Sequence, residues 1–142
     1  MRKLCAFLVL LALPVLAEKK VIIPPEMAGS TSPFSPGILV DGTLYCSGMI
    51  GTDAKTGKVP EEFEAEVKLA FERIGSVLKA AGMTYKDIVS VHIFLTDTDL
   101  FARMNAVYTT IVPEPRPARA TVGVNKLVVP GARMEVSVIA HK

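Results

Sequence analysis

The stretch Ile88-Val89-Ser90-Val91-His92-Ile93-Phe94-Leu95 alternates between two sets of side chains and is rich in β-branched residues. One set contains Val89, Val91, Ile93 and Leu95, and the other contains Ser90, His92 and Phe94. A period of two over this length predicts a central β-strand. His92 is therefore expected to belong to one face of the strand rather than to act as a ligand.

An amphipathic helix is predicted before this strand, across residues 61–81. Its apolar residues recur at intervals of three and four, and charged residues occupy other positions. Gly82 is a typical residue to end such a helix. The expected inward residues are Phe63, Val67, Ala70, Phe71, Ile74, Leu78 and Ala81, and the charged residues elsewhere are Glu64, Lys68, Glu72, Arg73 and Lys79.

A second helix is predicted after the strand, across residues 100–112. Thr98-Asp99 is a suitable N-terminal cap. Pro113 ends the helix because proline lacks the backbone N–H that a helix interior needs. The inward residues of this helix are expected to be Phe101, Met104, Tyr108 and Ile111.

Further strands are predicted on both sides of this segment. Asp41-Gly42 lies between the apolar runs 38–40 and 44–47, which is a strong hairpin signal. Residues 118–127 and 134–140 are expected to form two more strands, joined across Pro130-Gly131. The order β-β-α-β-α-β-β predicts an α+β fold with two helices on one face of a mixed sheet.

The last two predicted strands are apolar on both faces, as Ala120, Val122, Val124, Val136, Val138 and Ile139 show. Two helices cover only one face of a sheet, so the other face needs a partner. We therefore expect the chain to oligomerise, with sites between subunits where residues of different strands converge.

Residues 1–17 have the pattern of a secretory signal peptide. The basic start at Arg2-Lys3 precedes an apolar run over residues 4–13, and Ala17 ends a small-residue cleavage site. The run is too short for a membrane anchor, and a buried N-terminal helix is the alternative. We expect export to the periplasm or medium, with residues 18–142 as a single mature domain.

Charge and composition exclude some classes of function. The chain has 16 Lys and Arg against 14 Asp and Glu, and loss of Arg2 and Lys3 with the signal peptide leaves 14 of each. The mature chain is thus formally neutral and has no basic stripe, so a nucleic-acid partner is not expected. After signal cleavage no membrane partner is expected either.

Cys46 is the one cysteine of the predicted mature chain, because Cys5 leaves with the signal peptide. No internal disulfide is possible, and Cys46 is expected to be a small buried apolar residue. A catalytic thiol would need a nearby histidine, and the chain offers only His92 and His141. With so few His and Cys residues, no metal site is expected.

Arg119 and Glu135 interrupt apolar, strand-forming stretches near the C-terminus. A guanidinium beside a buried strand needs an anion, because an unpaired buried charge is costly. Two hypotheses follow: Glu135 is that anion, or a bound carboxylate is.

The segments 32–37, 46–48, 57–60, 78–82, 87–89, 104–108, 117–120 and 134–136 form a pattern that extends over nearly the whole predicted mature chain. In these segments, and in Ile139-Ala140, the chain resembles the RidA (YjgF-type) family of enamine/imine deaminases. The resemblance implies a homotrimer of chorismate-mutase-like subunits with three sites in the clefts between neighbours.

The resemblance also implies roles for particular residues. The family's carboxylate-binding arginine corresponds to Arg119, its asparagine to Asn105, its acidic residue near the attacking water to Glu135, and its serine to Ser47. The family's loop tyrosine is Phe34 here, so the ring is kept and the hydroxyl is lost. The residue after Ser47-Gly48, frequently glutamine in the family, is Met49.

These residue types suit hydrolysis of a 2-imino acid. Arg119 offers a planar fork for the carboxylate, and Glu135 can activate a water for attack on the C=N carbon. A backbone amide near Ala120 or Ser47 can position the other end of the substrate. The imine is already reactive, so no metal or organic cofactor is expected.

The expected function is deamination of 2-aminoacrylate or 2-iminopropanoate to a 2-keto acid and ammonia. The alternatives are an exported trimer that binds a small carboxylate without turnover, and a protective, chaperone-like trimer. An interfacial Arg119–Glu135 salt bridge without catalytic function also remains open.

Overall fold

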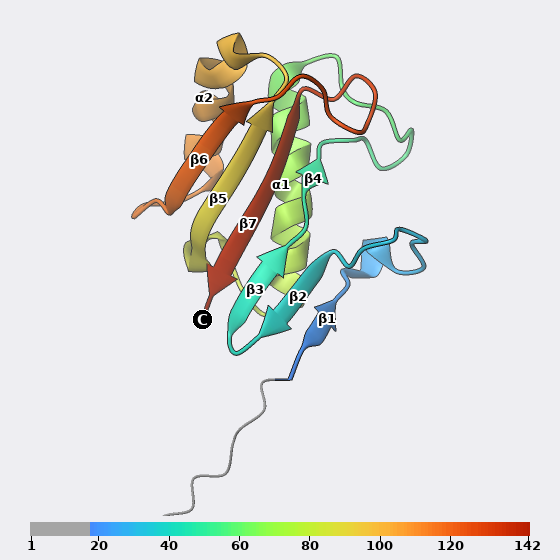
Figure 1. The fold of residues 1–142 in the computed structure, drawn as a ribbon, viewed down its shortest axis with the longest axis vertical. Coiled ribbons are helices and arrows are strands. Elements are labelled where there is room, and N and C mark those ends of the chain that lie inside the picture. Colours follow the sequence, from blue (N-terminus) through green and yellow to red (C-terminus); the bar gives the residue numbers. More distant parts are fainter. Residues whose placement is uncertain (1–17) are drawn as a thin grey trace, which may run out of the picture.

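The computed structural model describes residues 18–142, and the predicted signal peptide, residues 1–17, lies outside them. Two α-helices pack on one face of a mixed sheet, as predicted from the sequence (Figure 1). The helices are α1 (Phe63–Ala80) and α2 (Phe101–Ile111). The strands are β1 (Lys20–Ile22), β2 (Gly37–Val40), β3 (Thr43–Cys46), β4 (Met49–Ile50), β5 (Ile88–Leu95), β6 (Ala118–Gly123) and β7 (Met134–His141).

The central strand β5 has the bounds that its alternation predicts. It pairs parallel with β6 on one side and antiparallel with β7 on the other. The strands that the sequence places on either side of Pro130-Gly131 therefore do not pair with each other. β6 also ends at Gly123 rather than at residue 127, because Gly123 pairs with Leu95, the last residue of β5.

The remaining strands extend the sheet beyond β7, in the order β1-β2-β3-β7-β5-β6. The predicted hairpin at Asp41-Gly42 is confirmed, with φ angles of 46° and 70° that suit this residue pair in a tight turn. The strands β1 and β4 were not predicted. Each has at most three residues, too few to show an alternating pattern.

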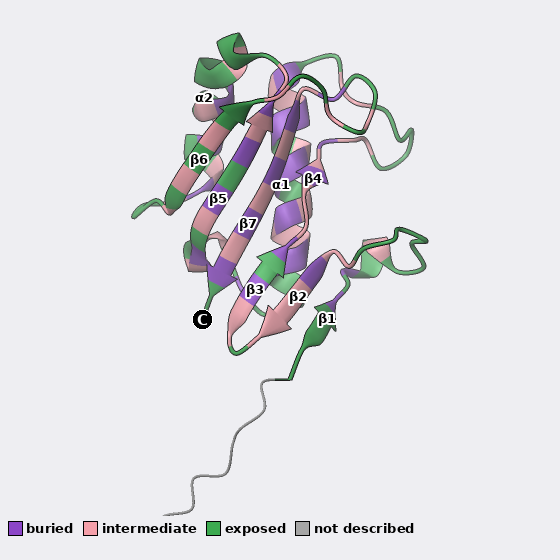
Figure 2. Cartoon of the chain, viewed as in Figure 1, coloured by how far each residue is buried: buried purple, intermediate pink, exposed green. Residues whose placement is uncertain are grey.

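The two helices begin and end inside their predicted ranges, and their inward faces form the core with the central strands (Figure 2). Phe63, Phe71, Ile74 and Leu78 of α1 are fully buried, as expected. Short 3-10 helices lie at Pro25–Met27, Tyr85–Asp87 and Thr98–Leu100. Asp97, rather than Thr98-Asp99, caps the last of these, because its side chain accepts from the backbone N–H of Asp99.

Two predictions of which side chains face inward are wrong. Phe101 was expected to be an inward residue of α2, but it is 43% exposed and lies beside the Arg119 guanidinium. Val89 was expected to lie on the same face as Val91, but Val89 is 49% exposed while Val91 is buried. The pairing of β5 with β7 shifts register between Ile88 and Ser90, so the alternation restarts there. His92, as predicted, is a residue of the exposed strand face.

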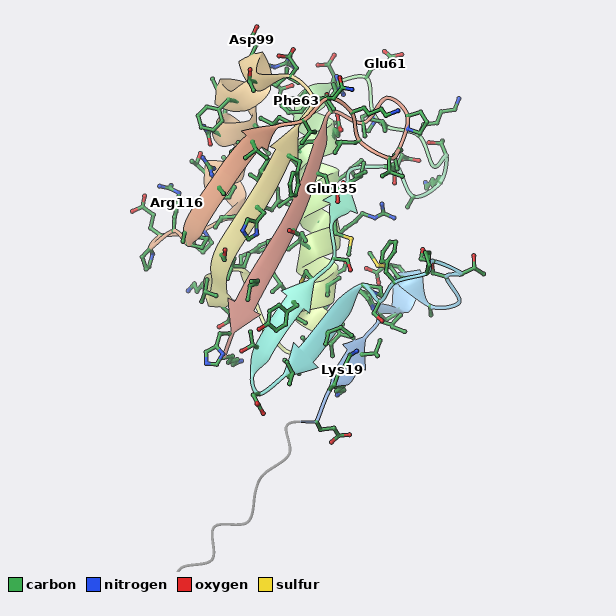
Figure 3. The ribbon with its side chains drawn as sticks, viewed as in Figure 1. Lys19, Glu61, Phe63, Asp99, Arg116 and Glu135 are labelled. Carbon is green, nitrogen blue, oxygen red and sulfur yellow. The ribbon has the colours of Figure 1, made fainter. Side chains whose placement is uncertain are left out.

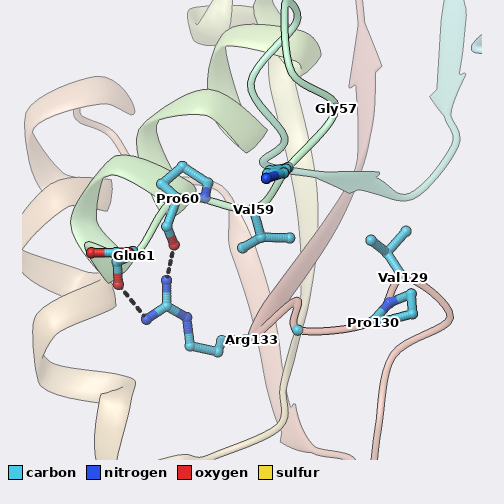
Figure 4. A pocket seen from close by; sticks show the side chains of 9 residues that line it. Gly57, Val59, Pro60, Glu61, Val129, Pro130 and Arg133 are labelled. Carbon is cyan, nitrogen blue, oxygen red and sulfur yellow. Dashed lines mark hydrogen bonds between the residues drawn. The ribbon is translucent and has the colours of Figure 1, made fainter.

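An ion pair between a half-buried arginine and a fully buried glutamate joins the start of β7 to the start of α1. Glu66 is fully buried, and its carboxylate accepts from the backbone N–H groups of Arg133 and Met134, at 2.6 and 3.0 Å, and from Arg133 Nε at 2.7 Å. Figure 3 shows Glu61 and Phe63 near the start of α1. Arg133 donates to the carbonyl oxygens of Pro60 and Glu61 as well (Figure 4).

Cys46, at the end of β3, is buried as predicted, and burial raises the pKa of its thiol to about 12. A thiol with so high a pKa is a poor nucleophile at neutral pH. Among residues 18–142, no helix is long and apolar enough to cross a bilayer.

We expect Glu66→Gln to lower the free energy of unfolding by about 3 kcal/mol, because an amide cannot accept from every donor that faces Glu66 and leaves Arg133 without its anion. Chemical denaturation measures this difference. Glu64→Gln is the control: it removes a carboxylate from the same helix, but Glu64 pairs with Arg103 at the exposed surface. Equal losses from both variants would contradict a special contribution of Glu66.

Candidate functional site

A cavity of about 630 Å³ lies beside the short strand β4. Its lining comes from five parts of the chain: the segment 26–36, the junction of β3 and β4, α1, the loop before β7, and β7 itself. Three predicted site residues, Phe34, Ser47 and Glu135, line this cavity together. The structure therefore brings together residues that are far apart in the sequence.

A β-bulge at the junction of β3 and β4 positions Ser47. Tyr45 pairs with Ile139, and Met49 pairs with Val136. The three residues between Tyr45 and Met49 therefore lie opposite the two residues between Val136 and Ile139, which makes a bulge. The backbone N–H of Ser47 donates to Pro36 O at 3.0 Å. Its hydroxyl donates to Ser35 O at 2.7 Å, which holds the segment that carries Phe34 against the sheet.

Gly48, the other bulge residue that lines the cavity, makes room for the carboxylate of Glu135. A Cβ atom at Gly48 would lie 2.8 Å from Glu135 Cδ and closer still to Oε1. Within residues 18–142, no side chain forms an ion pair or hydrogen bond with Glu135. The Glu135 carboxylate is thus partly buried, fixed by packing, and available to a ligand or a water.

Arg119 lies away from this cavity, against helix α2. Its guanidinium is 4.6 Å from the ring centre of Tyr108 and 5.7 Å from that of Phe101. Burial raises the pKa of Tyr108, and the charge of Arg119 opposes that rise. No carboxylate of residues 18–142 lies within 4.0 Å of the Arg119 guanidinium.

Asn105 belongs to the same region as Arg119. It follows Phe101 by four positions on α2 and precedes Tyr108 by three, so the three side chains share one stripe of the helix. Asn105 and Arg119 therefore form a second cluster, which is separate from Phe34, Ser47 and Glu135. Neither Asn105 nor Arg119 lines the cavity.

The two clusters lie on opposite faces of the sheet. Arg119 is paired with Val91, which is buried beneath the helices, whereas Glu135 is paired with Phe94 on the other face. Paired residues project to the same side of a sheet, so Arg119 and Glu135 of one chain point apart. The hypothesis that Glu135 is the anion of Arg119 within one chain is therefore wrong. Ala120 pairs with His92 and lies on the face of Glu135.

Sequence reasoning missed two features of this region. In the sequence Gly48 is one residue of a motif, and only the structure shows that its missing side chain leaves space for Glu135. The helix pattern predicts that Arg73 lies outside the apolar stripe, and the structure adds that it lines the cavity. Within residues 18–142 no group of three His, Cys, Asp or Glu side chains is arranged to hold a metal ion.

Comparison with known proteins identifies the family. A sequence model of the family described as Endoribonuclease L-PSP matches residues 26–142. Protein mmf2, mitochondrial, from Schizosaccharomyces pombe is 36% identical over 124 residues, which cover 85% of this chain and 97% of mmf2.

Two solved structures share the fold along the same length. RidA from the Antarctic bacterium Psychrobacter sp. PAMC 21119 has a TM-score of 0.79 at 33% identity, covering 87% of this chain and 100% of RidA. E. coli TdcF with bound serine has a TM-score of 0.80 at 27% identity, covering 87% of this chain and 98% of TdcF. The chain therefore belongs to the endoribonuclease L-PSP family, which includes the YjgF and Rid proteins.

Proposed function

We propose that this protein is a hydrolytic deaminase of reactive 2-enamine and 2-imino acids, which it converts to 2-keto acids and ammonia. The observation that carries the proposal is the Glu135 carboxylate, which lies over Gly48 in a cavity that Phe34 and Ser47 also line. It is a potential proton acceptor that no side chain of residues 18–142 occupies.

The second half of the site comes, in this proposal, from a neighbouring copy of the chain. Arg119 and Glu135 of one chain are on opposite faces of the sheet, so no small ligand reaches both. The face that carries Glu135 is not covered by helices, and Tyr45 and Val122 are each 48% exposed. Homotrimers are typical of the family. A trimer covers this face and supplies Arg119 and Asn105 across the contact.

The proposed reaction needs only these side chains. The neighbour's Arg119 binds the substrate carboxylate through its planar fork, and Asn105 supports that end. Glu135 accepts a proton from a water whose oxygen bonds to the C=N carbon, which gives a carbinolamine. Glu135 then returns this proton to the amino nitrogen, the C–N bond breaks with its electron pair staying on nitrogen, and ammonia leaves as the hydroxyl loses its proton and the C=O double bond forms. A metal or organic cofactor has no step in this scheme.

Binding of a small carboxylate without turnover is the second candidate. The structure of TdcF contains bound serine, a small amino acid with a carboxylate. The same Arg119 would serve that function, and Glu135 would then have no proton to accept. Cleavage of RNA has less support, because residues 18–142 have equal numbers of basic and acidic side chains and no basic stripe.

We also propose that residues 1–17 are a secretory signal and that the protein acts outside the cytosol. The proposal rests on the basic, apolar and small-residue pattern alone. Mass spectrometry of the protein from a native envelope fraction should find an N-terminus at or near Glu18. An intact Met1 terminus in a cytosolic fraction would contradict export.

We expect Arg119→Lys to lower kcat/KM for 2-iminopropanoate by about two to three decades, because an ammonium group cannot reproduce the bidentate fork. Glu135→Gln should lower turnover while leaving affinity for pyruvate largely intact, because glutamine cannot accept the proton. Imines formed in situ by an amino-acid oxidase provide the assay.

Arg116→Lys is the matched control, since Arg116 is three residues earlier and pairs with Glu114 at the surface. Phe34→Tyr should raise turnover if the missing hydroxyl limits the reaction. Wild-type protein that binds pyruvate but never accelerates imine hydrolysis would leave only the carboxylate-binding function.

We expect mixed trimers to recover activity from two inactive variants. If each site takes Arg119 from one subunit and Glu135 from the next, unfolding and refolding Arg119→Ala with Glu135→Gln should restore about a quarter of wild-type activity, the share that random mixing gives. Each variant refolded alone is the control. A mixture that stays as inactive as its components would show that the two residues act within one chain or not at all.

A further inference from the structure

The cavity beside β4 contains a cation that the proposed reaction does not use. Arg73 projects from α1 and is the one Lys or Arg among the described residues that line the cavity. Glu135, Ser47 and Phe34 line the same space. A charged side chain that faces a substrate cavity affects which substrates bind there.

The position of the Arg73 guanidinium is fixed from one side. Its Nη1 atom donates to Ile50 O at 3.0 Å and to Thr52 Oγ1 at 2.9 Å, at the end of β4. Among residues 18–142, Nε and Nη2 make no hydrogen bond, and no carboxylate lies within 4.0 Å of the group. Arg73 is therefore held in place with donors to spare, which suits an anionic ligand.

The two acidic residues that line the cavity do not neutralise Arg73. Glu26 is stabilised as an anion by a hydrogen bond from the Ser76 side chain, by its own backbone N–H and by the charge of Lys79, which together hold its pKa below the usual range. Glu135 lies over Gly48. The cavity thus combines a proton acceptor, Glu135, with a separate anion-binding group, Arg73.

We propose that Arg73 binds a second anionic group on the substrate, so that the preferred substrates are 2-imino dicarboxylic acids. This inference rests on the deaminase function proposed above. The carboxylate beside the C=N bond goes to Arg119 of the neighbouring subunit, the imine carbon lies near Glu135, and the distal carboxylate of the side chain binds Arg73. The bonds that form and break are those of the monocarboxylate reaction.

The size and lining of the cavity agree with this assignment. A volume of about 630 Å³ is far larger than a three-carbon imino acid needs. Phe34, Met49 and Val129 provide apolar surface for the methylene groups between the two carboxylates. The alternative is that Arg73 only satisfies the carbonyl of Ile50, a function that would affect all substrates equally.

The test is the ratio of kcat/KM for 2-iminoglutarate to that for 2-iminopropanoate, with both imines formed in situ by an amino-acid oxidase. For the full-length wild-type protein we expect a ratio of about ten or more, and for Arg73→Met a ratio near one, with the change mainly in KM. Lys68→Met removes a charge from the exposed side of the same helix, where Lys68 pairs with Glu72, and should keep the wild-type ratio.

Arg73→Lys provides a second variant if Arg73→Met does not fold, since it keeps one donor for Ile50 O and loses the fork. Its ratio of kcat/KM for 2-iminoglutarate to that for 2-iminopropanoate should fall between those of the wild-type protein and Arg73→Met. Hydrolysis of both imines with the same ratio in wild type and Arg73 variants would overturn the dicarboxylate inference and leave the deaminase in place.

Binding of 2-oxoglutarate and pyruvate, measured by calorimetry, separates the remaining outcomes. If neither imine is hydrolysed but 2-oxoglutarate binds more tightly than pyruvate in an Arg73-dependent manner, the anion site stands and the deaminase fails. Absence of both hydrolysis and Arg73-dependent binding would overturn both proposals.

Discussion

The ion pair between Glu66 and Arg133 fixes the relative position of the two elements that build the cavity. A carboxylate with no solvent exposure is tolerated only when its oxygens are satisfied, and three donors from Arg133 and Met134 do this. Such an arrangement allows little sliding between α1 and β7. Glu135, on β7, follows Arg133 by two residues, and Arg73 follows Glu66 by seven on α1, which is about two helical turns. Both cavity charges are therefore positioned by one buried contact.

Two glycines allow the edge of the sheet to approach these charged elements closely. At Gly51, a Cβ atom would lie 3.0 Å from the Cα of Glu66 and nearer to its carbonyl group, so this end of β4 packs directly on the α1 backbone. At Gly48, the missing side chain leaves the space that the Glu135 carboxylate occupies. The bulge that contains Gly48 also turns Ser47 toward the segment that carries Phe34. The shape of the cavity thus depends on side chains that are absent as well as on those present.

The parts of the fold that the sequence predicts are those in which burial leaves a local pattern. The bounds of β5 follow from its alternation, and the turn at Asp41-Gly42 follows from residues that tolerate positive φ.

Glu66 shows why other features cannot be predicted from the sequence. Its charge suggests solvent, and its partner Arg133 lies 67 residues away. Arg73 looks like any charged residue outside the apolar stripe of a helix, because the loop and strand that form the cavity around it contribute nothing to the local pattern. The family resemblance supplied the site residues, but only the register of β5 with β6 and β7 shows that they form two groups.

The separation of Arg119 from Glu135 has a consequence for the chemistry. If the two faced each other within one chain, they would form a salt bridge, and each would lose the property that the proposed reaction needs: the open fork of the arginine and the free lone pairs of the carboxylate. Stacking on Tyr108 and Phe101 holds the guanidinium without using a carboxylate. Packing over Gly48 likewise holds the Glu135 carboxylate in place without a cation. In the proposed trimer, the contact that buries the exposed apolar face also brings the two groups to opposite sides of one substrate, so a subunit alone has half a site and a substrate between the charges keeps them from pairing.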